Sequence, residues 1–223
     1  MKRTSLLLTL VAAFTDATTF VGAGKLFSAH VTGNFIVLAY DIIYGADPNE
    51  WSKLLAFPVF FGGVMVAGRI ANRNSGAVVG EGQPDGGNRL LRIEGILLML
   101  AGLAAAAMRW WHLGQVWLLV VVSMTIVVAM AFQNAFGRLY SKRIYGPTTV
   151  MTGNVTSAAL DIAALLLDRP RHPEKFVPLG HNLAMIGVFL AGCFIGGACA
   201  YFFGLAAVLV PGVVVMVYLV FSP

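Results

Sequence analysis

Two short polar motifs interrupt otherwise apolar stretches of the chain. Thr32-Gly33-Asn34 and Thr152-Gly153-Asn154 lie 120 residues apart, and six of eleven residues are identical when 32–42 is aligned with 152–162. Thr and Asn side chains accept hydrogen bonds from the free backbone N–H groups at a helix start. Gly permits a turn or a close approach by backbone or ligand. Because helix N-termini also attract negative or polar groups, each motif predicts a helix start that binds a small polar solute.

Asp16 is the single residue with the strongest indication of a function, because it lies in the middle of the first apolar stretch. A carboxylate at that depth in a membrane costs at least ~2.5–3.5 kcal/mol unless it is neutralised or paired. Two roles fit: a proton carrier or cation ligand that couples transport, or a capped carboxyl that ties helices together. Thr15-Asp16 of the first copy aligns with Gln133-Asn134 of the second. Any chemistry that needs a charged group is therefore restricted to the first copy at this position. We include Gln133 and Asn134 among the predicted solute-binding residues.

Three further carboxylates have weaker signals. Asp41 and Asp161 each follow the Asn of their motif by seven residues, or two helical turns on the same face. They fit either vestibule residues or solvated helix ends. Glu94, close to Arg92, fits an interfacial ion pair.

Enzyme chemistry has no support in the sequence. The four histidines are scattered, His and Cys show no metal-ligand spacing, and no phosphate-binding loop stands out. We therefore expect no enzyme, no metal and no cofactor.

The composition is typical of a membrane protein. Hydrophobic residues make up 58% of the chain and charged residues 11%, against about 45–50% and about 25% in soluble domains. Residues 176–223 contain no Asp, Glu, Lys or Arg over 48 positions. The net charge of +5 is spread in small clusters between apolar runs and forms no basic stripe, so we expect no nucleic-acid partner. The predicted fold class is an all-α polytopic membrane protein.

The distribution of Lys and Arg selects between two topologies. Eight apolar stretches are present: Thr4–Phe20, Val31–Tyr44, Leu54–Gly68, Ile93–Met108, Gln115–Phe132, Met151–Leu167, Leu183–Tyr201 and Phe202–Phe221. If all eight stretches cross the membrane, seven of the 15 basic residues lie on the inner side and eight on the outer side. If Val31–Tyr44 and Met151–Leu167 are re-entrant, twelve lie on the inner side and three on the outer side. Because basic residues collect on the cytoplasmic side, we predict six spans with both termini cytoplasmic. Trp51, Trp110, Trp111 and Trp117 then all fall near the outer interface.

The duplication also predicts how the two halves are related. Three spans per copy is an odd number, so the second copy enters the membrane from the opposite side, which defines an inverted repeat. We assign 1–110 to the first repeat, including a cytoplasmic linker at about 71–90, and 111–223 to the second. Extended segments at Phe27–Val31 and Pro147–Met151 precede re-entrant helices over about 34–44 and 154–167.

The motifs resemble those of the YoaK-like family of uncharacterised bacterial membrane proteins. The resemblance covers nearly the whole chain and rests on Asp16, Thr32-Gly33-Asn34, Gln133-Asn134 and Thr152-Gly153-Asn154. It implies a location in the bacterial cytoplasmic (inner) membrane. It implies no substrate.

Three function classes follow from the sequence. The leading hypothesis is a transporter or permease that binds a small polar solute between the two re-entrant helix starts, coupled to protons or cations through Asp16. The alternatives are a passive channel for a small solute or ion, and a non-transporting membrane sensor or scaffold. The expected partners are the lipid bilayer, the solute or ion, and a second copy in a homodimer. The homodimer is suggested by small size and by glycine-rich spans such as Gly192-x-x-x-Gly196.

Overall fold

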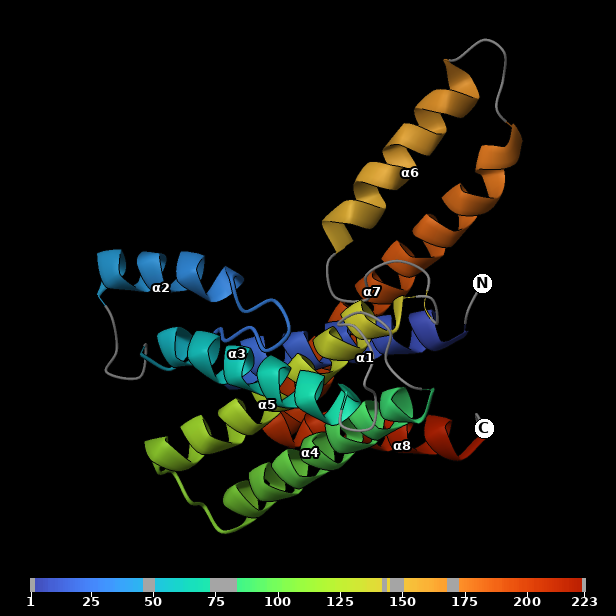
Figure 1. The fold of residues 1–223 in the computed structure, drawn as a ribbon. Helices are drawn as coiled ribbons and strands as arrows, with labels where there is room; N and C mark the ends of the chain where they lie inside the picture. Colours follow the sequence, from blue (N-terminus) through green and yellow to red (C-terminus); the bar gives the residue numbers. More distant parts are fainter. Residues whose placement is uncertain are drawn as a thin grey trace.

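The protein is all-helical over the residues that the structure describes. The computed structural model describes residues 3–45, 51–72, 84–141, 144, 151–167 and 173–221, and no strand occurs among them. The described α-helices are α1 (Arg3–Gly22), α2 (Gly33–Tyr44), α3 (Trp51–Asn72), α4 (Pro84–Trp110), α5 (Val116–Leu139), α6 (Met151–Leu166), α7 (Phe176–Phe203) and α8 (Leu209–Phe221). Two short 3-10 helices, η3 (Pro173–Lys175) and η4 (Gly204–Val208), flank α7. The predicted all-α class is confirmed (Figure 1).

Five stretches of helix are long and apolar enough to cross a membrane, as expected for an integral membrane protein. They are Arg3–Gly22, Trp51–Asn72, Gly86–Trp110, Val116–Leu139 and Phe176–Phe221. The last contains 46 residues, which as one straight helix would extend about 69 Å, more than twice the ~30 Å hydrocarbon core. The chain instead turns at Gly204, whose φ of 59° suits glycine, and α8 runs back so that both termini lie at the same end (Figure 1).

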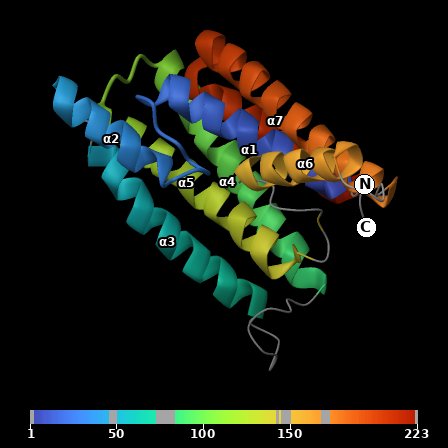
Figure 2. The same ribbon diagram turned by 90° about the horizontal axis from the view of Figure 1, so that it is seen from above.

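The helices that follow the two polar motifs are shorter. At 12 and 16 residues, α2 and α6 extend only about 18 and 24 Å, less than the hydrocarbon core. Helix α2 packs on α3 and α6 packs on α7, at opposite ends of the molecule (Figures 1 and 2). In both views each helix begins at its inner end and runs outward.

The boundaries of these segments mostly match the sequence. The helix starts, expected near residues 34 and 154, lie at Gly33 and Met151, and Phe27–Val31 is non-helical as predicted. The extended segment predicted at Pro147–Met151 lies outside the described residues except for Met151, which belongs to α6. The linker expected at about 71–90 is shorter, because α3 continues to Asn72 and α4 begins at Pro84.

Tryptophans and basic residues separate to opposite ends of the bundle. Trp51 begins α3, Trp110 ends α4 and Trp117 lies in the first turn of α5, and all of these side chains are exposed. Four of the six described basic residues on these three helices lie at the other ends: Arg69, Arg89, Arg92 and Arg138. The other two, Lys53 and Arg109, lie at the tryptophan ends. This separation is the one expected if α3, α4 and α5 cross the membrane in alternating directions.

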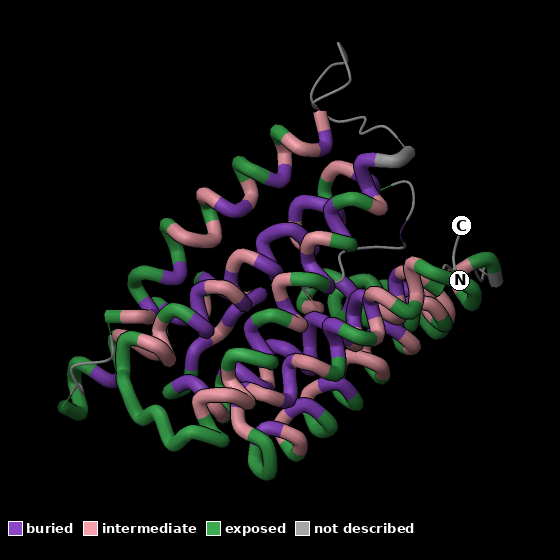
Figure 3. Tube along the Cα trace, turned by 90° about the horizontal axis from the view of Figure 1, so that it is seen from below, coloured by how far each residue is buried: buried purple, intermediate pink, exposed green. Residues whose placement is uncertain are grey.

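Glycines set the closest contacts between helices, within a core that lies along the inside of the bundle (Figure 3). Helix α1 has its most extensive contact with α7, where a Cβ on Gly192 would lie 2.8 Å from the Ala13 Cβ. A Cβ on Gly196 would collide with the backbone of Phe14. The Gly192-x-x-x-Gly196 face therefore contacts α1 of the same chain, and a homodimer, which stays a prediction, would need another surface.

We expect Gly196→Ala to destabilise the protein, because the added methyl group meets backbone atoms of α1 that cannot rotate away. Overpacking of this kind costs about 1–3 kcal/mol. Gly197→Ala is the matched control, since a Cβ at Gly197 meets nothing within 4 Å. Thermal unfolding in detergent should show a lower Tm for Gly196→Ala and an unchanged or slightly higher one for Gly197→Ala. Equal Tm values for the two variants would contradict the α1–α7 packing.

Candidate functional site

Asp16 binds the non-helical segment that connects α1 to α2. Its Oδ1 accepts hydrogen bonds from the backbone N–H of Ser28 at 2.7 Å, the Ser28 hydroxyl at 2.9 Å and the Ala29 N–H at 2.6 Å. Its Oδ2 accepts from the His30 N–H at 3.2 Å and contacts His30 Nδ1. A carboxylate has about four acceptor positions, so these five donor groups fill them. The carboxyl is 4% exposed and holds the segment against α1.

His30 is the one titratable partner of Asp16 among the described ion pairs. The imidazole is 29% exposed, and its ring lies edge-on to Phe189 of α7, with centroids 5.8 Å apart. The Asp16–His30 pair therefore lies where α1, the connecting segment and α7 meet. Sequence analysis treated His30 as one of four scattered histidines and missed this pairing.

The first Thr-Gly-Asn motif binds the same connecting segment through Asn34. Asn34 is fully buried, and its amide makes two hydrogen bonds to Phe27: Oδ1 accepts from the Phe27 N–H and Nδ2 donates to the Phe27 carbonyl, both at 2.8 Å. A Cβ on Gly33 would lie 3.0 Å from the Phe27 ring, so glycine allows that ring to pack on the helix start. The expected cap by Thr32 is wrong, because Thr32 occupies the N-cap position but makes no side-chain capping bond.

The second motif lies inside the first turn of α6, one residue after the helix begins. Asn154 is 3% exposed, like its counterpart Asn34, whereas Thr152 and Gly153 are exposed. A Cβ on Gly153 would meet nothing within 4 Å. Both motifs thus bury the Asn and leave the Thr exposed at an inner helix end.

Gln133 and Asn134 occupy the place on α5 that Thr15 and Asp16 occupy on α1. Gln133 is fully buried, and its Nε2 donates to the Leu8 carbonyl at 2.8 Å, which links α5 to α1. Asn134 Nδ2 donates to the Met130 carbonyl of its own helix at 3.0 Å. Gln133 therefore joins two helices of the core, and Asn134 bonds back along α5.

Asp41 is held between two lysines near the outer end of α2. Its Oδ2 lies 2.5 Å from Lys53 Nζ of α3, and its Oδ1 lies 3.3 Å from Lys25 Nζ. The Lys53 side chain is 2% exposed, so this part of the pair is buried. Removing one partner of a buried pair typically costs ~3–5 kcal/mol. The pair fixes α2 to α3.

Asp161 makes the corresponding contact between α6 and α7. Its Oδ1 lies 3.4 Å from Lys175 Nζ, and its Oδ2 accepts from Asn182 Nδ2 at 3.5 Å. Asp41 and Asp161 are each 7% exposed, so neither is a solvated helix end. A signal was available in the sequence, since each Asp is followed by a Lys at the start of the next helix.

Glu94 does not form the expected ion pair with Arg92. Arg92 is exposed, whereas Glu94 is fully buried in α4. Neither Glu94 oxygen has a hydrogen-bond partner among the residues that the structure describes. The Glu94 side chain lies inside the bundle, and the nearby Arg92 in the sequence gave no indication of this burial.

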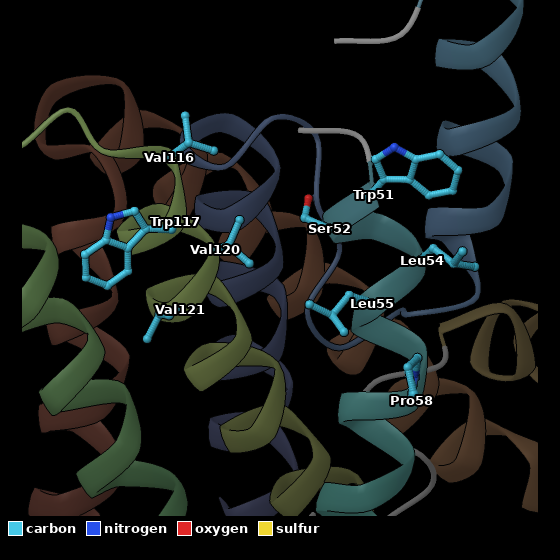
Figure 4. A pocket seen from close by; sticks show the side chains of 9 residues that line it. All are labelled: Trp51, Ser52, Leu54, Leu55, Pro58, Val116, Trp117, Val120 and Val121. Atoms are coloured by element: carbon cyan, nitrogen blue, oxygen red, sulfur yellow. The ribbon is translucent and has the colours of Figure 1, made fainter. Parts of the chain in front are cut away.

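A groove of about 900 Å³ lies between the beginnings of α3 and α5, away from the residues above (Figure 4). Its lining is Trp51, Ser52, Leu54, Leu55, Pro58, Val116, Trp117, Val120 and Val121. Ser52 supplies the only hydroxyl in that lining, so the groove offers little to a polar solute. Metal binding also lacks a candidate, because the described residues contain no cluster of three or more His, Cys, Asp or Glu side chains.

We expect Asp16→Asn to destabilise the protein strongly. The substitution turns one acceptor into a donor that faces the N–H groups of residues 28–30, and each buried donor left unpaired costs about 1–3 kcal/mol. A loss of at least about 3 kcal/mol should appear in denaturant unfolding in detergent.

Thr15→Val is the control for that measurement. Thr15 is fully buried beside Asp16, and its hydroxyl has no hydrogen-bond partner in the described part of the chain. Replacing it with valine should leave stability unchanged or raise it. If Asp16→Asn were as stable as Thr15→Val, the role of Asp16 in holding the segment would be refuted.

Comparison with known proteins places the chain in a family without assigning an activity. No curated protein and no solved structure matches it. The family model described as "Protein of unknown function (DUF1275)" matches residues 4–221, which is nearly the whole chain. The match agrees with the expected membership of an uncharacterised family and carries no YoaK-like name. The chain belongs to the DUF1275 family of proteins of unknown function.

Proposed function

We propose that the protein is a small transporter or permease of the bacterial cytoplasmic membrane with an inverted repeat of three spans per copy. In this proposal α2 and α6 are re-entrant half-helices, and a small polar solute binds between their N-terminal ends near the membrane midplane. One repeat rocks against the other to expose the solute to each side in turn. Protons or cations are coupled through Asp16.

The observation that carries this proposal is the pair of short helices at opposite ends of the bundle. Both begin at a buried Asn in the interior, and both are too short to cross. Broken helices whose N-termini point to the midplane are the usual binding elements of transporters with inverted repeats. The partial positive charge of a helix N-terminus suits a polar or anionic solute.

Equivalent contacts in the two copies support the inverted repeat. The Asp41–Lys53 pair joins α2 to α3, and the Asp161–Lys175 pair joins α6 to the end of η3, directly before α7. A Cβ on Gly63 would lie 2.8 Å from the Ala131 Cβ of α5, just as one on Gly192 would lie 2.8 Å from the Ala13 Cβ of α1. Because the chain also aligns Ala13 with Ala131, α1 and α7 pair in the way that α5 and α3 pair.

Proton coupling through Asp16 would act on the connecting segment. All acceptor positions of the carboxylate are engaged, so a proton or cation that binds there must replace one of the present donors. The His30 ring is the donor that can itself change charge. A proton on His30 would strengthen its bond to the carboxylate, whereas a proton taken up by Asp16 would remove an acceptor position and loosen the segment that leads into α2.

Labelling from the two sides of the membrane tests the re-entrant helices. Tyr44 and Leu166 are 74% and 76% exposed at the ends of α2 and α6. In a background with Cys193 and Cys199 replaced by serine, Tyr44→Cys and Leu166→Cys should react with an impermeant maleimide from opposite sides, Tyr44→Cys from the outside. Eight crossings would place both on the cytoplasmic side, and that result would refute the topology.

A binding screen tests the solute site. We expect a subset of small anions, cations, amino acids or nucleobases to raise the Tm of the purified protein, because a ligand that binds only the folded state stabilises it. Gly153→Val should fold normally and lose at least tenfold in affinity for the same compound. The control is Gly187→Val, since a Cβ at Gly187 on α7 likewise meets nothing within 4 Å.

Flux in proteoliposomes then separates the function classes. A transporter gives saturable flux of the stabilising compound that depends on a proton or cation gradient. Rapid, unsaturated flux that ignores such gradients would identify a passive channel instead. Binding without flux would identify a membrane sensor, and no binding in the whole screen would contradict the solute site.

A further inference from the structure

Glu94 lies inside the bundle, and no group in the described part of the chain neutralises or binds it. The side chain is fully buried, and neither carboxyl oxygen has a hydrogen-bond partner among the described residues. Its neighbours one turn away on α4 are Leu90, Leu91 and Leu98, all at most 2% exposed. An ionised carboxylate in such surroundings is far more costly than the neutral acid.

The helices that pack on α4 bring no charge to Glu94. Helix α8 and η4 contain no Asp, Glu, Lys, Arg or His. The basic residues of α3 and α5 are engaged or exposed elsewhere: Lys53 pairs with Asp41, and Arg69 and Arg138 are exposed. On α4 itself, Arg89 and Arg92 are also exposed. The carboxyl therefore has no described ion-pair partner that would hold it ionised.

Gly95, the residue next to Glu94, lies in the close contact between α4 and α8. A Cβ on Gly95 would lie 3.0 Å from Met216 Cγ and 3.3 Å from Val215 Cγ1. A Cβ on Gly212 would lie 3.1 Å from the Gly95 carbonyl oxygen and 2.9 Å from the Met99 nitrogen. No water fits between helices packed this closely, so water reaches Glu94 from the side of α8 only if the two helices separate.

We propose that Glu94 is an intramembrane proton-binding site that is neutral while α4 and α8 are in contact and ionised when they part. Release of the proton follows hydration of the carboxyl, and uptake of a proton allows the contact to close again. The proton site stands independently of transport. Its use in coupling rests on the transporter proposed above, in which α4 and α8 belong to different repeats.

Infrared difference spectroscopy on the purified full chain tests the protonation state. At pH 6 the wild-type protein should show a C=O stretch of a protonated carboxyl that Glu94→Gln lacks, and this band should disappear reversibly when the pH is raised within the range in which the protein stays folded. A carboxylate band at pH 6, or a protonated band that never titrates while the protein stays folded, would overturn the proposal. If Glu94→Gln does not fold, the spectrum of Glu94→Met can be subtracted from that of the wild-type protein instead, because Met is an apolar side chain of similar size.

Cysteine reactivity tests the link between ionisation and separation of the helices. Val215→Cys, placed in the Cys193→Ser, Cys199→Ser background, is buried at the α4–α8 contact. The quantity compared is the rate of its reaction with a water-soluble maleimide at pH 9 divided by the rate at pH 6. This ratio should be several-fold higher in the protein with Glu94 than in Glu94→Gln. Thiol ionisation contributes equally to both proteins and cancels in this comparison.

Ala200→Cys on α7 is the control position, because it is 4% exposed and lies away from that contact. Its pH ratio should be the same with Glu94 and with Gln. Equal pH ratios at Val215→Cys in the two proteins would overturn the coupling. This failure is distinguishable from a failure of the transport proposal, since neither experiment requires a substrate or a flux.

Discussion

The need to bond every buried backbone polar group governs the path of the chain from α1 to α3. The chain leaves α1, passes through a non-helical segment and enters α2 in the interior, where lipid would leave N–H and C=O groups unpaired at several kcal/mol each. Asp16 binds the N–H groups of residues 28–30, and Asn34 binds both backbone groups of Phe27. With the segment held in this way, α2 can reverse direction and meet α3 at the Asp41–Lys53 pair.

The chemistry differs between the two regions that carry a Thr-Gly-Asn motif. On α1 a carboxylate holds the connecting segment and contacts a histidine, whereas the matching position on α5 is Asn134, an amide that bonds to its own helix. Charge is therefore buried in the middle of the first copy only, while both copies have an Asp–Lys pair at the outer part of the short helix. An inverted repeat with this asymmetry would have one half that responds to protonation and one half that does not.

Hydropathy was sufficient for the all-helical class and for the long apolar helices, because apolar length depends on the bilayer rather than on packing. The six-span topology and the inverted repeat stay predictions. The repeated Thr-Gly-Asn motif located the starts of α2 and α6 to within three residues. The partners of Asp16 could not be predicted, since they depend on where the connecting segment runs. The burial of Glu94 was missed for a related reason: α8 is apolar all round, so its sequence does not say which side meets α4.

The contact between α4 and α8 also constrains how the protein is made. Helix α4 leaves the ribosome long before α8, and its Gly95 and Gly102 are shaped to receive Val215, Met216 and Leu209. Until α8 is inserted, that glycine-lined surface and the adjacent Glu94 must face lipid or an insertion factor. Assembly of the bundle therefore ends with a helix that closes onto one synthesised much earlier, so a ribosome that stalls before α8 leaves an acid exposed inside the bilayer.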